Sequence, residues 1–219
     1  MRSLWAAVRE LLIVVGIALV LSSVVRIFIF QAFYVPSASM QDTLLLQDRI
    51  IATKITKPFT DIKRGQIVVF KDPGDWLPVF EEDKNLPMHL LSVVGLLPSD
   101  AGDDLVKRVI GIGGDTIKCC SPQGNILINN TELKDQDFIK PGVNTNQVEF
   151  EITVPKNRIF VMGDNRPDSR DSRFHLETAY GTVPTRNVVG PVNLRIWPFN
   201  RFAVLKIPEA FSVIPDAQN

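Results

Sequence analysis

Residues 11–30 read LLIVVGIALVLSSVVRIFIF, an apolar run of twenty residues interrupted by a single charge at Arg26. As a helix rising about 1.5 Å per residue, this run would extend roughly 30 Å, the hydrocarbon thickness of a bilayer. Arg26 lies near one end of the run, where a long basic side chain can reach the polar interface. The sequence therefore predicts one N-terminal transmembrane helix over residues 11–30.

The charges ahead of the run favour one orientation. Arg2, Arg9 and the amino terminus outweigh Glu10, and basic flanks are typical of the cytoplasmic side of a membrane. We therefore expect a single-pass protein of the plasma membrane, with residues 1–10 in the cytoplasm. Residues 31–219 would form one extracytoplasmic domain, which is long enough to enclose its own core.

A second interpretation of the same run is a cleavable signal peptide. Arg2 and Arg9 supply a basic start, and Ser37-Ala38-Ser39 has the small–x–small pattern of a cleavage site. The apolar part of a signal peptide usually spans only about 7–15 residues, which favours the transmembrane helix. Cleavage after Ser39 would also remove the serine on which the motifs below depend.

Composition excludes several classes of partner and cofactor. Lysine plus arginine equals aspartate plus glutamate at 24 each, and the basic residues are scattered. We therefore expect no nucleic-acid partner. The only cysteines, Cys119 and Cys120, are adjacent and form no disulfide framework. Together with the two histidines they fit no usual metal-ligand spacing, so we expect no metal site and no cofactor.

Beyond Phe33 the chain consists of short apolar runs rich in β-branched residues, separated by turn signals such as Gly113-Gly114-Asp115. This pattern predicts a mostly β domain of coiled antiparallel sheets or a partly closed barrel. Residues 72–104 contain four prolines and little alternation, which is typical of an insertion or a long loop. The predicted strands are 49–53, 66–70, 106–112, 125–128, 158–162, 188–192 and 194–197.

A serine-rich segment, Pro36-Ser37-Ala38-Ser39-Met40, follows the predicted membrane helix and would lie close to the bilayer surface. A serine hydroxyl needs a nearby base to act as a nucleophile. The only histidines, His89 and His175, are more typical of structural or surface positions. A lysine can replace histidine when burial lowers its pKa, and Lys107 is the best candidate because it has apolar neighbours on its own strand face. The alternative is an ordinary solvated strand lysine.

A charged loop, residues 162–173, places three aspartates and three arginines directly after a predicted strand. One interpretation is a solvated surface loop whose charges pair with one another. The other is an ion-pair and hydroxyl network that fixes the geometry of an active site, because bidentate Arg–carboxylate pairs hold side chains in place. The residues alone do not separate these two interpretations.

Four segments, in order along the chain, resemble the conserved boxes of bacterial type I signal peptidases. The resemblance extends from Phe33 to about Trp197 and implies a serine endopeptidase that cleaves signal peptides from exported preproteins after small–x–small motifs. The four segments are Pro36–Met40, Arg64–Phe70, Lys107–Gly111 with Gly114-Asp115, and Gly163–Arg166 with Asp171–Arg173.

The resemblance also implies roles for the matched residues. Ser39 would be the nucleophile and Lys107 the general base. The Ser39 backbone N–H and the Ser37 hydroxyl would form the oxyanion hole. Ser169 would orient the lysine, with Asp171 and Arg173 supporting it. Shallow substrate pockets would be lined by Phe33, Val35, Met40, Leu44, Leu105 and Val106.

The implied partners are the signal peptides of preproteins and the membrane lipid, and we expect a monomer. The substrate would lie extended beside residues 105–107 as an added strand. A self-cleaving Ser/Lys peptidase of the repressor type shares the dyad but not the membrane helix. From a different class, an inactive membrane-tethered β scaffold that binds other subunits would tolerate the loss of Ser39 or Lys107.

Overall fold

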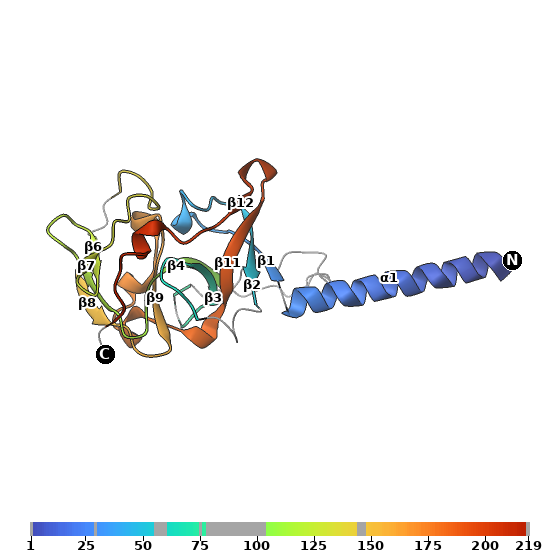
Figure 1. Ribbon diagram of the computed structural model, residues 1–219, viewed down its shortest axis with the longest axis horizontal. Coiled ribbons are helices and arrows are strands. Elements are labelled where there is room, and N and C mark those ends of the chain that lie inside the picture. Colours follow the sequence, from blue (N-terminus) through green and yellow to red (C-terminus); the bar gives the residue numbers. More distant parts are fainter. Residues whose placement is uncertain are drawn as a thin grey trace.

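A long apolar helix followed by a β domain makes up the computed structural model of this chain (Figure 1). The structure describes residues 2–28, 30–54, 61–74, 76–77, 104–143 and 148–217. The fold is mostly β, with coiled antiparallel sheets and one N-terminal apolar helix, as the sequence predicts.

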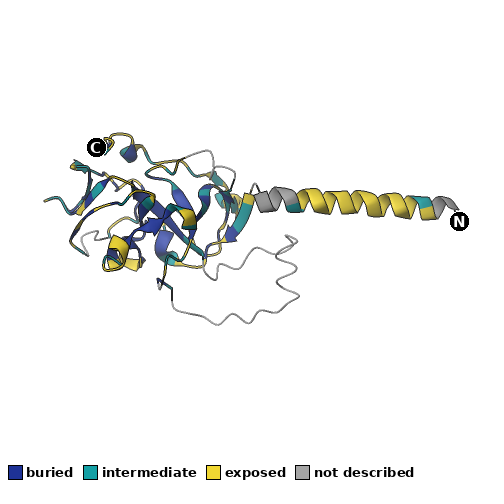
Figure 2. Cartoon of the chain, turned by 90° about the horizontal axis from the view of Figure 1, so that it is seen from below, coloured by how far each residue is buried: buried dark blue, intermediate teal, exposed yellow. Residues whose placement is uncertain are grey.

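The helix, α1 (Arg2–Phe28), is longer than the predicted membrane run at its N-terminal end. Residues 2–10 contain no proline or glycine to prevent helix formation. The helix ends before Phe30, which is the first residue of a strand and not part of the helix as predicted. Within α1, residues Trp5–Ser23 are long and apolar enough to cross a membrane, and none of this stretch is buried by the β domain. Figure 2 shows its exposed residues in yellow along the helix.

The larger sheet has eight strands in the order β1-β2-β11-β3-β4-β9-β10, with β12 paired to β11, and all the pairings are antiparallel. The long strand β11 joins β2 to β3, and register shifts along it mark the positions where the sheet bends. The strands are β1 (Phe30–Tyr34), β2 (Arg49–Thr53), β3 (Ile67–Lys71), β4 (Asp104–Ile112), β9 (Arg158–Met162), β10 (Val183–Pro184), β11 (Val188–Trp197) and β12 (Ala203–Val204).

A smaller antiparallel sheet has the order β7-β6-β5-β8. Its strands are β5 (Thr116–Cys119), β6 (Ile126–Ile128), β7 (Thr131–Glu132) and β8 (Phe150–Thr153). Short 3₁₀ helices connect the strands: η1 (Ala38–Met40), η2 (Arg166–Asp168), η3 (Ser172–Phe174), η4 (Ala179–Gly181), η5 (Thr185–Asn187), η6 (Phe199–Arg201) and η7 (Glu209–Phe211).

The β domain encloses three apolar clusters. One lies between the small sheet and β9, around Ile117 and Phe160. A second joins β1, β2 and η1 around Phe33 and Met40, and a third packs β3 against β9 around Phe70. These clusters are the dark blue interior in Figure 2. Apolar packing around Met40 thereby fixes η1, the short helix that contains Ser39.

The tryptophans and cysteines of the β domain differ in their burial and contacts. Trp197 is 42% exposed, because it lies at the end of β11 against Phe199. Trp76 is buried, and its ring stacks on His175 at 4.5 Å between centroids. Cys119 and Cys120 are bridged to each other. The centre of the predicted 72–104 insertion, with His89, lies outside the described residues.

Candidate active site

Ser39 and Lys107 meet in the centre of the β domain although 68 residues separate them in the sequence. Ser39 is carried by η1, which begins after the strand β1 and the proline at position 36. Lys107 is carried by the middle of β4. The Lys107 Nζ donates to Ser39 Oγ at 2.6 Å. A nucleophile and a basic group are therefore in direct hydrogen-bond contact.

Lys107 is buried, not a solvated strand lysine. Only 3% of its surface is exposed, and Ser39 is 6% exposed. Burial lowers the Lys107 pKa from its ordinary value to about 8, against the opposing effect of the Asp171 and Asp164 carboxylates, which raise it. A lysine with this pKa has a substantial neutral fraction near pH 8 and can accept a proton there.

Ser37, two residues before Ser39, is exposed. Its Oγ is 3.1 Å from Ser39 Oγ. The hydroxyl of Ser37 and the backbone N–H of Ser39 thus belong to the same short turn. Their proximity is compatible with two donors that converge on one oxygen.

The charged loop after β9 is a buried network. Arg173 binds the Asp171 carboxylate with Nε at 2.8 Å and Nη2 at 2.9 Å, and Gly163 donates its backbone N–H to Asp171 at 3.0 Å. Burial alone would raise the pKa of Asp171, but the Arg173 guanidinium and the Gly163 N–H lower it below its usual value. Of the two interpretations of this loop, the ion-pair network is the one observed.

Close packing fixes the distance between this loop and η1, the turn that carries Ser39. A Cβ at position 163 would collide with the Ser39 carbonyl oxygen and with Ser169 Oγ. Only glycine therefore allows η1 and the loop to approach this closely. Ser169 is buried, and its Oγ forms no hydrogen bond to Lys107 among the described residues. Its role in orienting the lysine stays a prediction.

A second buried ion pair joins the charged loop to Arg108, a partner that the sequence did not indicate. Arg108 binds Asp164 with Nε at 2.8 Å and Nη2 at 2.6 Å, and Asp164 also accepts from the Thr43 hydroxyl at 2.5 Å. Arg166 similarly pairs with Asp135 at 2.5 Å. The Arg108–Asp164 ion pair therefore joins the strand that carries Lys107 to the loop, and the Thr43 hydroxyl adds the segment after η1 to it.

Removal of Arg173 should destabilise the domain strongly. Arg173→Met would leave the Asp171 charge buried without its partner, and such a loss typically costs about 3–5 kcal/mol. Urea unfolding in detergent, followed by tryptophan fluorescence, would measure the change. Lys118→Met is the matched control, because Lys118 and Glu151 are 52% and 60% exposed and such pairs contribute about 0–1 kcal/mol. Equal effects of the two substitutions would contradict a stabilising role for the buried pair.

The predicted pocket residues lie in two neighbouring clusters. One cluster, beside η1, contains Phe33, Val35, Met40, Leu44 and Val106. Leu105 packs on the third cluster instead, with Val109, because successive residues of β4 point to opposite faces. β3 pairs with β4 along residues 104–108, whereas β9 pairs with β4 only from Arg108 onward. Residues 105–107 therefore have one strand edge without a partner among the described residues.

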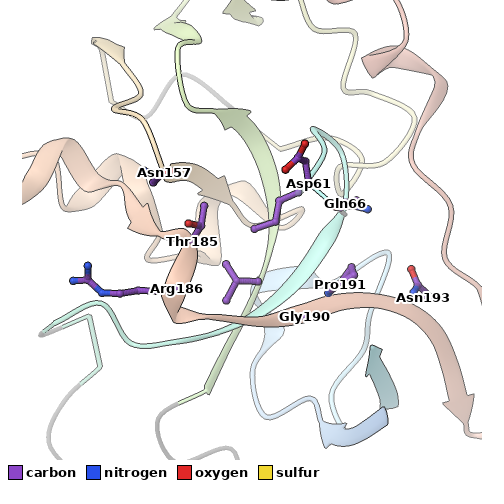
Figure 3. A pocket seen from close by; sticks show the side chains of 10 residues that line it. Asp61, Gln66, Asn157, Thr185, Arg186, Gly190, Pro191 and Asn193 are labelled. Atoms are coloured by element: carbon purple, nitrogen blue, oxygen red, sulfur yellow. The ribbon is translucent and has the colours of Figure 1, made fainter. Parts of the chain in front are cut away.

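A separate cavity of about 510 Å³ lies between the start of β3, η5 and β11 (Figure 3). Its lining includes Asp61, Asn157, Arg186 and Asn193. It contains neither Ser39 nor Lys107. None of the described residues that line it is a serine, cysteine, lysine or histidine, so the candidate active site is the buried pair on η1 and β4.

Comparison with known proteins gives a match over most of the chain. A family model described as signal peptidase, peptidase S26, matches residues 8–197. A probable signal peptidase I of Mycobacterium leprae is 34% identical over an alignment 230 residues long, gaps included, which covers 90% of this chain and 78% of that protein. Signal peptidase I of Mycobacterium tuberculosis is 33% identical over 227 residues, covering 92% and 76%. The crystal structure of a signal peptidase I from Enterococcus faecalis has 24% identity and a TM-score of 0.38, covering 60% of this chain and 97% of that chain.

Proposed function

The chain belongs to the signal peptidase family, peptidase S26, and from this premise we propose that it is a membrane-anchored serine endopeptidase with a Ser39–Lys107 dyad. Its substrates would be exported preproteins, cut after small–x–small motifs. Membership of the family supports the general activity, which is cleavage of signal peptides by a peptidase. The dyad is supported by one observation above all, the 2.6 Å contact between Lys107 Nζ and Ser39 Oγ in a buried site.

Acylation is the first half of the proposed reaction. Neutral Lys107 takes the proton of the Ser39 hydroxyl as Oγ attacks the scissile carbonyl carbon. The resulting oxyanion accepts hydrogen bonds from the Ser39 N–H and the Ser37 hydroxyl. When the C–N bond breaks, Lys107 donates its proton to the leaving amine, which is the new N-terminus of the mature protein. The signal peptide remains as an ester on Ser39.

Deacylation returns the enzyme to its starting state. A water molecule loses a proton to Lys107 and attacks the ester carbonyl, and the second oxyanion uses the same two donors. Collapse of this intermediate releases the signal peptide with a free carboxylate. The proton held by Lys107 returns to Ser39 Oγ. The cycle consumes one water and uses only side chains and one backbone N–H of the chain itself.

The unpaired edge of β4 supports the proposed mode of substrate binding. An extended peptide could add to residues 105–107 as a strand, using backbone hydrogen bonds for affinity. Alternate side chains of such a peptide would point toward the apolar residues beside η1. Shallow apolar pockets select small side chains at alternate positions, which is the pattern of a small–x–small motif.

The apolar helix supports anchoring in the membrane. Residues Trp5–Ser23 have the length and composition of a membrane span, and β1 begins two residues after α1 ends. We propose that the N-terminus lies in the cytoplasm and the β domain outside. The site would then lie near the membrane surface, where preproteins emerge with their signal peptides still in the bilayer.

Cleavage of a purified preprotein by the full-length protein in detergent tests this function. We expect a single new N-terminus, identified by mass spectrometry, after a small–x–small motif. A matched preprotein with phenylalanine at the last signal-peptide position should be cut at least about 100-fold more slowly, because the added ring cannot enter a shallow pocket. A folded protein that cuts neither preprotein would favour the inactive scaffold, and equal cutting of both would contradict the motif preference.

A further inference from the structure

Asn165 holds the nucleophile turn by two successive backbone carbonyls. Its backbone N–H donates to the Ser39 carbonyl at 3.0 Å, and its side-chain Nδ2 donates to the Ala38 carbonyl at 3.0 Å. Asn165 is 1% exposed and more than 120 residues distant from η1 in the sequence. One residue of the loop after β9 therefore clamps both peptide groups that flank the Ser39 Cα.

The Ala38 carbonyl accepts from Asn165 Nδ2 and, at 2.9 Å, from the Gln41 backbone N–H of η1, and these two bonds together fix the direction of the Ser39 N–H. The carbonyl of Ala38 and the N–H of Ser39 belong to the same peptide group, which is planar and trans, so they point in opposite directions. A carbonyl held on Asn165 therefore turns the Ser39 N–H away from the loop. That N–H is the backbone donor assigned to the oxyanion, and donors act best when their direction is set before reaction.

Asn165 is itself held in place by its neighbours. Asp164, the preceding residue, is held by the Arg108 guanidinium of β4, and its carbonyl accepts from the Lys140 N–H at 3.0 Å. The Asn165 carbonyl accepts from the Asp168 N–H at 3.1 Å within η2. The two elements that carry Lys107 and the clamp are thus joined through a buried ion pair. A site supported in this way keeps its donors within a narrow range of directions.

We propose that Asn165 is a positioning residue that orients the Ser39 N–H toward the oxyanion through the shared Ala38–Ser39 peptide. It acts through the backbone and does not touch the reacting atoms. The proposal rests on the proposed function, because the oxyanion arises only if Ser39 attacks a peptide carbonyl. The side-chain amide is the part that matters, since any residue supplies the backbone N–H.

The test replaces the amide with alanine and with its isosteric acid. Asn165→Ala and Asn165→Asp both remove the Nδ2 donor, and removal of oxyanion stabilisation typically costs about 100–1000-fold in kcat. We expect kcat/KM for preprotein cleavage to fall about 100-fold in both variants. Affinity for a peptide aldehyde, which forms a tetrahedral adduct with the serine, should fall by a similar factor. Affinity for an unreactive peptide of the same sequence should stay within about twofold.

Two controls separate this role from a general loss of structure. Gln41→Ala removes a side chain that contacts the same Nδ2 at 3.4 Å but does not touch the Ala38 peptide. Asn193→Ala removes an exposed asparagine bonded to Thr53. Both should cleave at close to the wild-type rate. The pH midpoint of Asn165→Ala and of the two controls should equal that of wild type, because these three substitutions leave the charges around Lys107 unchanged. Asn165→Asp adds a carboxylate and is therefore left out of the pH comparison.

The outcomes are distinguishable. A wild-type protein that does not cut preproteins would overturn the proposed function itself. With an active wild type, retention of kcat/KM within about threefold in both Asn165 variants would overturn the positioning role. Equal losses of affinity for the aldehyde and the unreactive peptide would also overturn it, as would failure of both variants to fold, because Asn165 would then serve substrate binding or folding instead.

Discussion

Lys107→Met is expected to abolish preprotein cleavage and, at the same time, to make the folded protein more stable. Methionine fills nearly the same volume as lysine but cannot accept a proton from Ser39. Loss of one member of a catalytic dyad typically costs about 10⁴-fold or more in kcat. The structure places this lysine in a site where only 3% of its surface meets solvent, so no water-exposed group can easily replace it as the base.

The gain in stability follows from the lowered pKa of Lys107. Burial brings this pKa from 10.5 to about 8, so the folded state binds the proton more weakly than the unfolded chain does. Lys107 therefore destabilises the folded wild-type protein. This effect develops as the pH falls from about 10.5 to about 8 and is complete below that range. At about 1.4 kcal/mol per pKa unit it amounts to about 3 kcal/mol. Loss of the hydrogen bond to Ser39 offsets about 1 kcal/mol of the gain from removing the lysine. At pH 7 we therefore expect the free energy of unfolding of Lys107→Met to exceed that of wild type by about 2 kcal/mol.

Urea unfolding and preprotein cleavage, measured on the same samples, check both parts of this prediction. Lys118→Met on β5 is the matched control, because its lysine is half exposed, and it should leave activity and stability near wild type. Ser39→Ala should also abolish cleavage, but it retains the buried lysine and gains no such stability. Residual cleavage by a folded Lys107→Met protein above about 1% of wild type would exclude this lysine as the base.

Local sequence patterns were sufficient to predict much of the fold. The runs at 49–53 and 158–162 became β2 and β9 with the predicted bounds, and 188–192 and 194–197 became the single strand β11. Their apolar residues lie in buried clusters, so hydrophobic runs and buried strands coincide. β5 and β8 were not predicted, because each has only four residues and the alternation within it is too short to stand out until the small sheet pairs the two strands.

The site was predictable only in part, because its contacts join distant segments. Residue types and the family resemblance selected Ser39, Lys107 and the charged loop. The resemblance placed Asp171 near the nucleophile but gave no reason for its burial, which arises from the fold of η3 back onto Gly163. Arg108 and Asp164 lay inside two of the quoted segments, but 56 positions separate them, so no local pattern pairs them with each other. Asn165 lay inside a quoted motif, and its role depends on two carbonyls of η1 that no local pattern identifies.

The rate of cleavage should depend on pH as the neutral fraction of Lys107 does. The reaction needs the neutral amine, and the pKa of this lysine is about 8. Between pH 8 and pH 6 its neutral fraction falls by about 50-fold, from one half to about one part in a hundred. We expect kcat/KM to rise with pH to a plateau above about pH 9. The pKa of His175 is lowered by burial from its ordinary value of 6.5, so its titration lies below the midpoint of this curve.

Asp171→Asn provides the decisive comparison for this profile. The Asp171 carboxylate raises the Lys107 pKa by attraction, so its neutralisation makes the protonated lysine less favourable. The acidic limb of the profile should therefore move to lower pH, even if the plateau rate falls because Arg173 loses its charged partner. Steady-state cleavage of a preprotein from pH 5.5 to 10 in a constant-ionic-strength buffer would measure both curves. A midpoint near 10.5 in wild type, as for a solvated lysine, would contradict the buried dyad, and a shift of the Asp171→Asn midpoint to higher pH would contradict the electrostatic coupling between Asp171 and Lys107.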